Sequence, residues 1–138
     1  MKSSSPNAGK KQLVKGEVLD ASALLALLQR EPGGENVTLQ GAVMNSVNFA
    51  EVVQKTAQRG KPTGTLLPEL TLLGLLVRPF SPEEGVIAGE LYLKTREQGL
   101  SLGDRACLAT ALTLAGVAVT ADRNWQAAEH GAQVRVIR

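Results

Sequence analysis

Five short, largely apolar runs recur along the chain, and each is separated from the next by a longer segment of helical character. Strands this short, alternating with helices, favour parallel βαβ units with right-handed crossovers. The continuous apolar run VAVT at 117–120 is typical of a strand that is covered on both faces. The sequence therefore predicts an α/β, three-layer sandwich with a central, mostly parallel sheet of about five strands. The expected strands cover residues 17–19, 41–47, 75–80, 117–120 and 134–137.

The segments between these runs carry helix signals. Ser81, Pro82 and Glu84 combine an N-cap residue, a proline in the first helical turn and an acid three residues after the cap. Pro68 weakens the helical pattern of the segment around it, because proline inside a helix removes a hydrogen bond. We expect helices over residues 22–30, 48–59, 62–73, 81–98 and 101–114, and a short one around 125–129.

The chain has 138 residues, which is the length of one domain. Its first fifteen residues hold four of the 15 basic residues and none of the 13 acidic ones. We therefore expect residues 1–16 to form a basic, disordered leader and residues 17–138 to form the folded domain. Without the leader, 11 basic and 13 acidic residues give a net charge of −2. This balance argues against a uniformly basic nucleic-acid scaffold.

The remaining composition indicates a cytoplasmic protein with no membrane partner. Cys107 is the only cysteine, which excludes an internal disulfide framework and a multi-cysteine zinc site, and its apolar neighbours predict a buried thiol. No apolar signal-peptide core follows the basic N-terminus, and no run reaches the roughly 18 apolar residues of a membrane span. We expect Trp125 in the core or an interface, and His130 at the surface.

Four acidic residues occupy positions where functional groups gather in open α/β sheets, beyond the carboxyl ends of the strands. Asp20 and Asp122 each follow a predicted strand, whereas Glu51 and Asp104 lie in the first turns of predicted helices. Each acid taken alone also fits a helix cap or a turn residue. A right-handed winding brings all four to one edge of the sheet, which favours a shared site over four independent caps.

Clustered carboxylates repel one another, and a hard divalent cation removes that cost. Oxygen ligands alone select Mg²⁺ or Mn²⁺ over zinc or copper. Such an ion activates water and neutralises charge on a phosphoryl group. The sequence therefore predicts a Mg²⁺ or Mn²⁺ site whose ligands are Asp20, Asp104 and Asp122, with Glu51 completing a catalytic set of four.

Four polar side chains lie near the same strand ends and are candidates to support the acids from a second layer. Thr120 is the strongest of them, because it lies two residues before Asp122 and so shares its face of the strand. For Ser22 and Asn124, a local cap or turn is an equally good interpretation. Ser46 is the fourth candidate.

Four segments resemble the PIN-domain family, in the order and spacing of that family. VLDASALLALLQREPG resembles its opening strand, acid and leucine-rich helix, and NSVNFAEVVQK resembles the segment that carries its second acid. LSLGDRACLATAL resembles the third-acid motif, and VAVTADRNW resembles the last strand with its T-x-D pattern. The resemblance covers roughly residues 17–138, and the size is similar to that of VapC-like toxins of type II toxin–antitoxin systems.

The resemblance implies a PIN-like fold and a Mg²⁺- or Mn²⁺-dependent endoribonuclease that acts as the toxin of a toxin–antitoxin pair. It implies that Asp20, Glu51, Asp104 and Asp122 carry the metal or the catalysis. It also implies a homodimer, a cognate antitoxin protein, and structured RNA such as transfer RNA as the substrate. Arg105 and Arg123 each follow one of these acids, so we expect them to bind substrate phosphates, with a salt bridge as the alternative.

Other functions remain open at this point. One is a PIN nuclease in RNA processing without an antitoxin. Another is a non-catalytic α/β module that binds Mg²⁺ or serves in assembly. A receiver-type phosphoacceptor also sets acids around Mg²⁺, but it requires a late lysine, and no lysine follows Lys94 in this chain.

Overall fold

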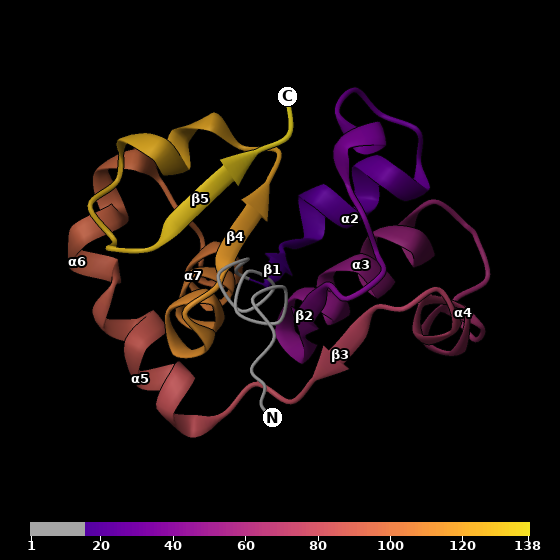
Figure 1. The fold of residues 1–138 in the computed structure, drawn as a ribbon, viewed down its shortest axis with the longest axis horizontal. Coiled ribbons are helices and arrows are strands. Elements are labelled where there is room, and N and C mark those ends of the chain that lie inside the picture. Colours follow the sequence, from indigo (N-terminus) through magenta and orange to yellow (C-terminus); the bar gives the residue numbers. More distant parts are fainter. Residues whose placement is uncertain (1–15) are drawn as a thin grey trace, which may run out of the picture.

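A computed structural model describes residues 16–138, and it contains a five-stranded sheet in which every paired strand is parallel. The strand order is β3-β2-β1-β4-β5, so β1 lies at the centre (Figure 1). This arrangement confirms the predicted α/β class and the number of strands. The strands are β1 (Glu17–Leu19), β2 (Val43–Asn45), β3 (Leu76–Arg78), β4 (Val117–Thr120) and β5 (Gln133–Val136).

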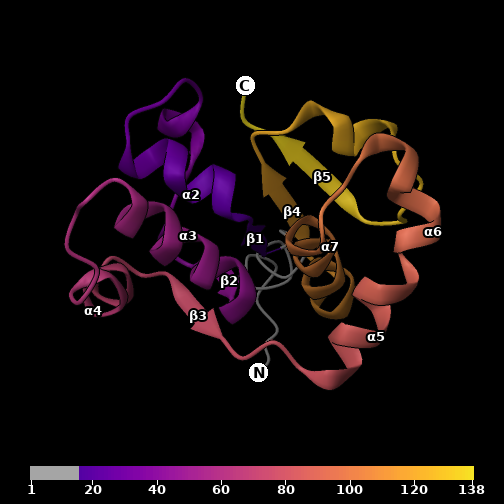
Figure 2. The ribbon, with the colours of Figure 1, turned by 180° about the vertical axis from the view of Figure 1, so that it is seen from behind.

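Helices cover both faces of the sheet and complete the three layers. In Figures 1 and 2, α2, α3 and α4 lie on one side of the molecule and α5, α6 and α7 on the other. The helices are α2 (Ala21–Leu28), α3 (Ser46–Gln58), α4 (Leu66–Leu72), α5 (Pro82–Glu90), α6 (Tyr92–Thr95) and α7 (Leu102–Leu114). The short 3-10 turns are η1 (Gly34–Asn36), η2 (Arg96–Gln98) and η3 (Arg123–Ala127).

Two apolar clusters form the core, one on each face of the sheet. Leu19 packs with α2 residues such as Leu24, whereas the preceding residue, Val18, packs with α7 residues such as Leu108. The alternation follows from the two-residue period of a strand, which sends neighbouring side chains to opposite faces. Cys107 lies in the second cluster and is buried, as predicted, and Trp125 packs beside it.

Several element boundaries differ from the sequence prediction. The second strand covers only three residues instead of 41–47, and the helix after it begins at Ser46, because Asn45 caps it. The helix expected over 62–73 begins only at Leu66. Pro68 then falls in the first helical turn, where its missing N–H has no intrahelical partner to lose.

The helix expected over 81–98 is interrupted. Its start is as predicted, since Ser81 and Glu84 form a reciprocal capping box. It then breaks near Leu91 into α5, α6 and η2, and Gly99 ends the segment with a left-handed φ of 71°. Two glycines within α5 lower the helix propensity of the segment, which accounts for its early end.

One prediction about a single residue is wrong, and one about the N-terminus is not tested by the structure. His130 was expected at the surface but is buried: its Nδ1 accepts the Ala132 N–H, and its Nε2 donates to the Trp125 carbonyl at 2.8 Å. The predicted basic leader falls on residues that lie, apart from Gly16, outside the described part of the chain. No helix within residues 16–138 has the length and apolar character needed to cross a membrane.

Candidate active site

Asp20 directly follows β1 and is buried, with 4% of its surface exposed. Its Oδ1 accepts the Ala23 N–H at 2.8 Å and caps α2, and its Oδ2 accepts the Thr120 hydroxyl at 2.7 Å. The Ser22 hydroxyl lies within 2.9 Å of both carboxylate oxygens. Asp20 therefore caps α2 with one oxygen, and with the other it contacts the strand that leads to Asp122.

Burial raises the pKa of Asp20 to about 6. Hydrogen bonds from Thr120, Ala23 and Ser22 oppose this rise, whereas the charge of Asp104 adds to it. Desolvation thus outweighs three donors, because an ionised carboxylate loses most of its hydration when it is enclosed. Asp20 is held in place by protein hydrogen bonds, and no cation among the described residues compensates its charge.

Asp122 lies just beyond β4, the strand that pairs with β1. Its Oδ1 accepts the backbone N–H of Asn124 and caps η3. Its own backbone N–H donates to the Thr120 hydroxyl at 3.1 Å, and the same hydroxyl donates to Asp20. Thr120 therefore joins the two acids that end neighbouring strands.

Glu51 of α3 lies against the start of α7, the helix that carries Asp104. Asp104 is the third residue of α7 and forms a capping box with Ser101, whose N–H donates to Asp104 Oδ2. The Glu51 carboxylate lies against the preceding residue, Gly103, where an added Cβ would approach Glu51 Oε2 to 2.5 Å. The absence of a side chain at Gly103 allows Glu51 to reach the start of α7.

The charges of these acids act on one another. Asp122 helps to raise the pKa of Asp104, although burial is the larger cause. Burial, and then the charges of Asp20, Asp104 and Glu51, raise the pKa of the Cys107 thiol well above its usual range. This mutual influence agrees with the contacts that join Asp20 to Asp122 through Thr120 and set Glu51 against Gly103, beside Asp104.

None of these four acids forms an ion pair with any residue between Gly16 and Arg138. The salt bridges in this part of the chain join Arg78 to Glu84, Arg135 to Glu17, and Arg138 to Glu31. The candidate site therefore concentrates negative charge, and among the described cations Arg105 acts on it by lowering the pKa of Asp104.

The donor set fits a hard divalent cation. Every donor is an oxygen, which suits Mg²⁺ or Mn²⁺. Within the described residues, no three acid, histidine or cysteine side chains converge as ligands of one ion. Mg²⁺ in proteins commonly uses only one or two carboxylates and keeps several waters. The raised pKa values of Asp20 and Asp104 indicate carboxylates that a cation would stabilise.

The four supporting side chains named from the sequence divide into two pairs. The hydroxyls of Ser22 and Thr120 contact Asp20 directly. Ser46 instead accepts the Phe80 N–H, which ties the start of α3 to the segment after β3. The side chain of Asn124 is exposed, and the backbone N–H of this residue is the group that reaches an acid.

The two arginines expected to bind substrate are engaged elsewhere. Arg105 Nη1 donates to the Ala88 carbonyl at 2.8 Å, and its guanidinium lies 5.4 Å from the centre of the Tyr92 ring. Arg123 Nε donates to the Arg138 carbonyl at 2.9 Å. Neither forms the alternative salt bridge with any described residue, and both are occupied by backbone carbonyls.

Two buried asparagines support the site and were not among the predicted residues. Asn45 caps α3 and donates to the Ala106 carbonyl and the Thr110 hydroxyl of α7. Asn48, at 0% exposure, donates to Glu51 Oε1 at 2.8 Å and to the Gly103 carbonyl at 2.9 Å. The helix predicted over 48–59 begins two residues earlier, at Ser46, and is capped by Asn45, so Asn48 lies inside it.

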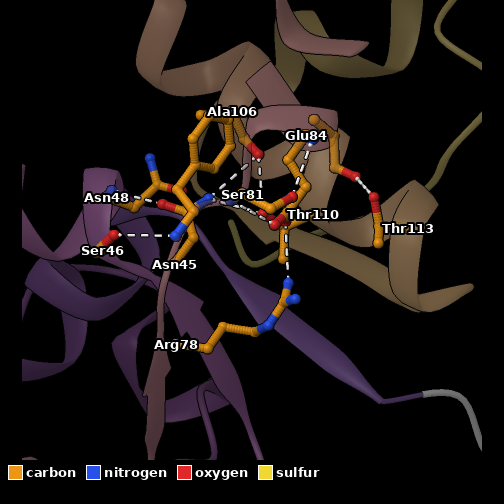
Figure 3. Close-up of polar contacts among 11 residues, drawn as sticks. Asn45, Ser46, Asn48, Arg78, Ser81, Glu84, Ala106, Thr110 and Thr113 are labelled. Atoms are coloured by element: carbon orange, nitrogen blue, oxygen red, sulfur yellow. Dashed lines mark hydrogen bonds and ion pairs between the residues drawn. The ribbon is translucent and has the colours of Figure 1, made fainter. Parts of the chain in front are cut away.

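Asn45 continues into a buried polar network at the α5–α7 contact (Figure 3). Glu84 lies fully buried there, accepts the Ser81 N–H, and forms a 3.0 Å ion pair with Arg78. Burial alone would raise the pKa of Glu84, but its donors Thr110 and Ser81 and the charge of Arg78 lower it. The network fixes α7, and with it Asp104, relative to β2 and α5.

Comparison with known proteins places this arrangement in a recognised family. A family model described as PIN domain matches residues 18–131. No curated protein matches the sequence significantly.

Solved structures share the fold at low sequence identity. A DNA-bound VapBC from Salmonella typhimurium is 13% identical, with a TM-score of 0.67 over 91% of this chain and 100% of that one. VapBC2 from Rickettsia felis, bound to a promoter DNA fragment, is 16% identical, with a TM-score of 0.66 over 88% and 98%. VapC20 from Mycobacterium tuberculosis, described as a sarcin–ricin loop cleaving toxin, is 15% identical, with a TM-score of 0.66 over 81% and 94%.

Proposed function

This chain belongs to the PIN domain family, and we propose that it is a metal-dependent endoribonuclease that acts as the toxin of a toxin–antitoxin pair in the cytoplasm. One observation carries the proposal. Two acids that follow β1 and β4 are joined through Thr120, the acid of α3 lies against the start of α7, which carries the fourth, and no residue from 16 to 138 forms an ion pair with them. Such a cluster is costly to fold and is suited to a divalent cation and a phosphodiester.

The surroundings of each acid indicate its proposed role. Asp20, Asp104 and Asp122 would hold Mg²⁺ or Mn²⁺, directly or through the waters that such an ion keeps, with Glu51 beside them. A bound divalent ion supplies charge neutralisation at the phosphoryl group and lowers the pKa of water. Asp20 is kept in one orientation by Thr120, Ser22 and Ala23, so its role is to bind and position.

Asp104 would reach the ion from the start of α7. Burial raises its pKa, and its Oδ2 accepts the Ser101 N–H, so the carboxylate is enclosed and held in one orientation. A bound cation would favour its ionised form.

The solved structures that share this fold support the toxin assignment. Several of them are VapBC complexes, and one is a toxin described as cleaving the sarcin–ricin loop. By this analogy the substrate is structured RNA, which includes transfer RNA, and a cognate antitoxin binds the protein. The scarcity of aromatic residues, at 3%, favours recognition of RNA by shape and backbone over base stacking.

Exposed apolar side chains support a homodimer. On α4, Leu72 and Leu67 are 86% and 46% exposed, and Leu73, which caps the helix, is 56% exposed. Exposed apolar side chains that gather in a patch mark protein–protein contacts. On α2, Leu24 is fully buried in the core, whereas Leu28 is 41% exposed.

The test is cleavage of a total small-RNA pool by purified protein in Mg²⁺, Mn²⁺ or EDTA. Asp104→Asn is run beside it, and Glu83→Gln, an exposed acid in α5, serves as the matched control. We expect metal-dependent cutting that Asp104→Asn abolishes and Glu83→Gln retains. Mass spectrometry of the preparation must show that no inhibitor has co-purified. A pure, folded protein that cuts no RNA under any metal would contradict the proposal.

A further inference from the structure

A groove runs between α2 and α3 and begins beside the candidate acids. One hollow is lined by Ser22, Leu25, Lys55 and Arg59. A second hollow shares Leu25 and Arg59 with it and extends to Lys61 and Leu66. Ser22, which lines the first hollow, is hydrogen-bonded to Asp20, so this end of the groove lies next to the candidate site.

The cations of this groove follow one face of α3. Glu51, Lys55 and Arg59 are spaced by four residues, which places them on the same side of the helix. Each step of four residues rises roughly 6 Å along a helix. The stripe therefore starts at a candidate catalytic acid and continues as two positive charges, with Lys61 just beyond the helix.

The three cations are exposed, and within the stretch from Gly16 to Arg138 none of them forms an ion pair. The one acid that lines the groove, Glu31, is paired with Arg138 at 3.5 Å. The groove is thus a positive channel that ends at a negative site. Arg105 and Arg123, the other cations next to the acids, are held by backbone carbonyls.

The occupant that fits this arrangement is a polyanion that continues into the acid site. We propose, on the basis of the proposed nuclease function, that Lys55, Arg59 and Lys61 bind the phosphate backbone of the RNA strand that is being cut. A strand in this groove places successive phosphates against the cations and presents the next linkage to the carboxylates. The apolar floor of Leu25, Leu28 and Leu66 accepts sugars and base edges.

The lining predicts sequence-tolerant binding. No aromatic residue of the described chain lines either hollow, so bases have no ring to stack on. Interactions with phosphates supply affinity and register without reading the sequence. The choice of target then rests on RNA shape and on which linkage reaches the acids.

The experiment measures RNA affinity without cleavage. All proteins carry Asp104→Asn, and the probe is a short, fluorescein-labelled single-stranded RNA of mixed sequence. The groove variant adds Lys55→Glu and Arg59→Glu. The matched control adds Lys94→Glu and Arg96→Glu, which change the net charge equally but line a different hollow. Anisotropy gives Kd over a range of salt concentrations, and circular dichroism checks folding.

We expect the groove variant to weaken RNA binding at least about tenfold. The log–log salt slope should fall by roughly 1.4, at about 0.7 for each phosphate that the protein no longer neutralises. The control should keep the parent slope and change Kd by less than about threefold. Equal Kd and slope in both variants, or no measurable RNA affinity in the parent, would overturn the inference. Unchanged RNA affinity with lost binding of a glutamate-rich amphipathic peptide would instead assign the groove to an acidic protein segment.

This outcome is separable from failure of the nuclease proposal. If the wild-type protein cuts RNA but the groove variants bind normally, only the groove assignment fails. If the wild-type protein cuts nothing while RNA binding still depends on Lys55 and Arg59, the groove assignment stands and the nuclease proposal fails.

Discussion

The Thr120 hydroxyl donates a 2.7 Å hydrogen bond to Oδ2 of Asp20, across 100 positions of sequence. The same oxygen of Thr120 accepts the backbone N–H of Asp122. A single buried side chain at the end of β4 thus orients one acid and anchors the segment that carries another. The contact exists because β1 and β4 are neighbours in the sheet, although they are far apart along the chain.

Replacement of this hydroxyl should move the pH dependence of activity. Thr120→Val keeps the shape of the side chain but removes a donor that lowers the pKa of Asp20, so that pKa should rise further. The acidic limb of the pH–rate profile then moves to higher pH, and stability falls by about 1 kcal/mol. Thr113→Val, at an exposed hydroxyl that bonds to the Ala109 carbonyl, is the control. An unmoved acidic limb would show that Thr120 does not tune Asp20.

Asp20→Asn should stabilise the metal-free protein at neutral pH. The folded-state pKa of Asp20 is raised from 3.8 to about 6. The unfolded chain therefore ionises first as pH rises, and folding stability falls between about pH 4 and pH 6. Asparagine removes this loss and still caps α2, so the gain at pH 7 is about 1–3 kcal/mol.

Urea denaturation in EDTA at several pH values measures this gain. The variant should gain nothing near pH 3, where the wild-type carboxyl is largely protonated in both states. Glu129→Gln, at an exposed acid, should leave the pH dependence unchanged. A wild-type protein whose stability does not fall between pH 4 and pH 6 would contradict the prediction.

Gly103→Ala should impair cleavage more than it impairs folding. The new Cβ would lie 2.5 Å from Glu51 Oε2, so the carboxylate must move away from the start of α7. We expect a loss of at least about tenfold in kcat/KM, or roughly 1.4 kcal/mol of transition-state stabilisation. Gly89→Ala is the matched control, since a Cβ there has no neighbour within 4 Å. That control should stabilise α5 by about 0.5–1 kcal/mol and leave cleavage intact. Equal activity in the two variants would remove Glu51 from the site.

Asn48 should matter through the position of Glu51. Asn48→Ala removes the donor to Glu51 Oε1 and to the Gly103 carbonyl, at a cost of about 1–3 kcal/mol. Asn48→Asp should lose more cleavage activity than Asn48→Ala, because it sets a second carboxylate against Glu51. Activity at matched folded fraction, measured over pH, separates this effect from loss of stability. The reverse ranking of the two variants would indicate a purely structural role.

Local sequence signals predicted which helices and strands this fold contains, but they predicted the first and last residues of these elements less well. The short apolar runs and the capping box at Ser81 were sufficient for the parallel sheet and the start of α5. The start of α3 was placed too late, because both Asn45 and Asn48 are good caps and only the tertiary contacts of Asn45 decide between them. Periodicity carries no information about such contacts.

In the candidate site too, the sequence predicted where the acids lie but not which partners the long side chains find. Positions after strands identified Asp20 and Asp122, because strand polarity alone brings them to one edge. The roles of Arg105 and Arg123 could not be read in that way, since adjacency in sequence does not fix where a long side chain finds its partner. The catalytic and metal-binding roles of the four acids remain predictions that the experiments above test.

Because β1 pairs with β4, the site can form only after the C-terminal part of the chain has been synthesised. Asp20 is made early, but Thr120 and Asp122 must leave the ribosome before the carboxylates meet. Until then the nascent chain holds isolated acids and no centre that could act on a phosphodiester. If the protein cuts RNA as proposed, this order would keep the growing polypeptide harmless to the message and ribosome that produce it.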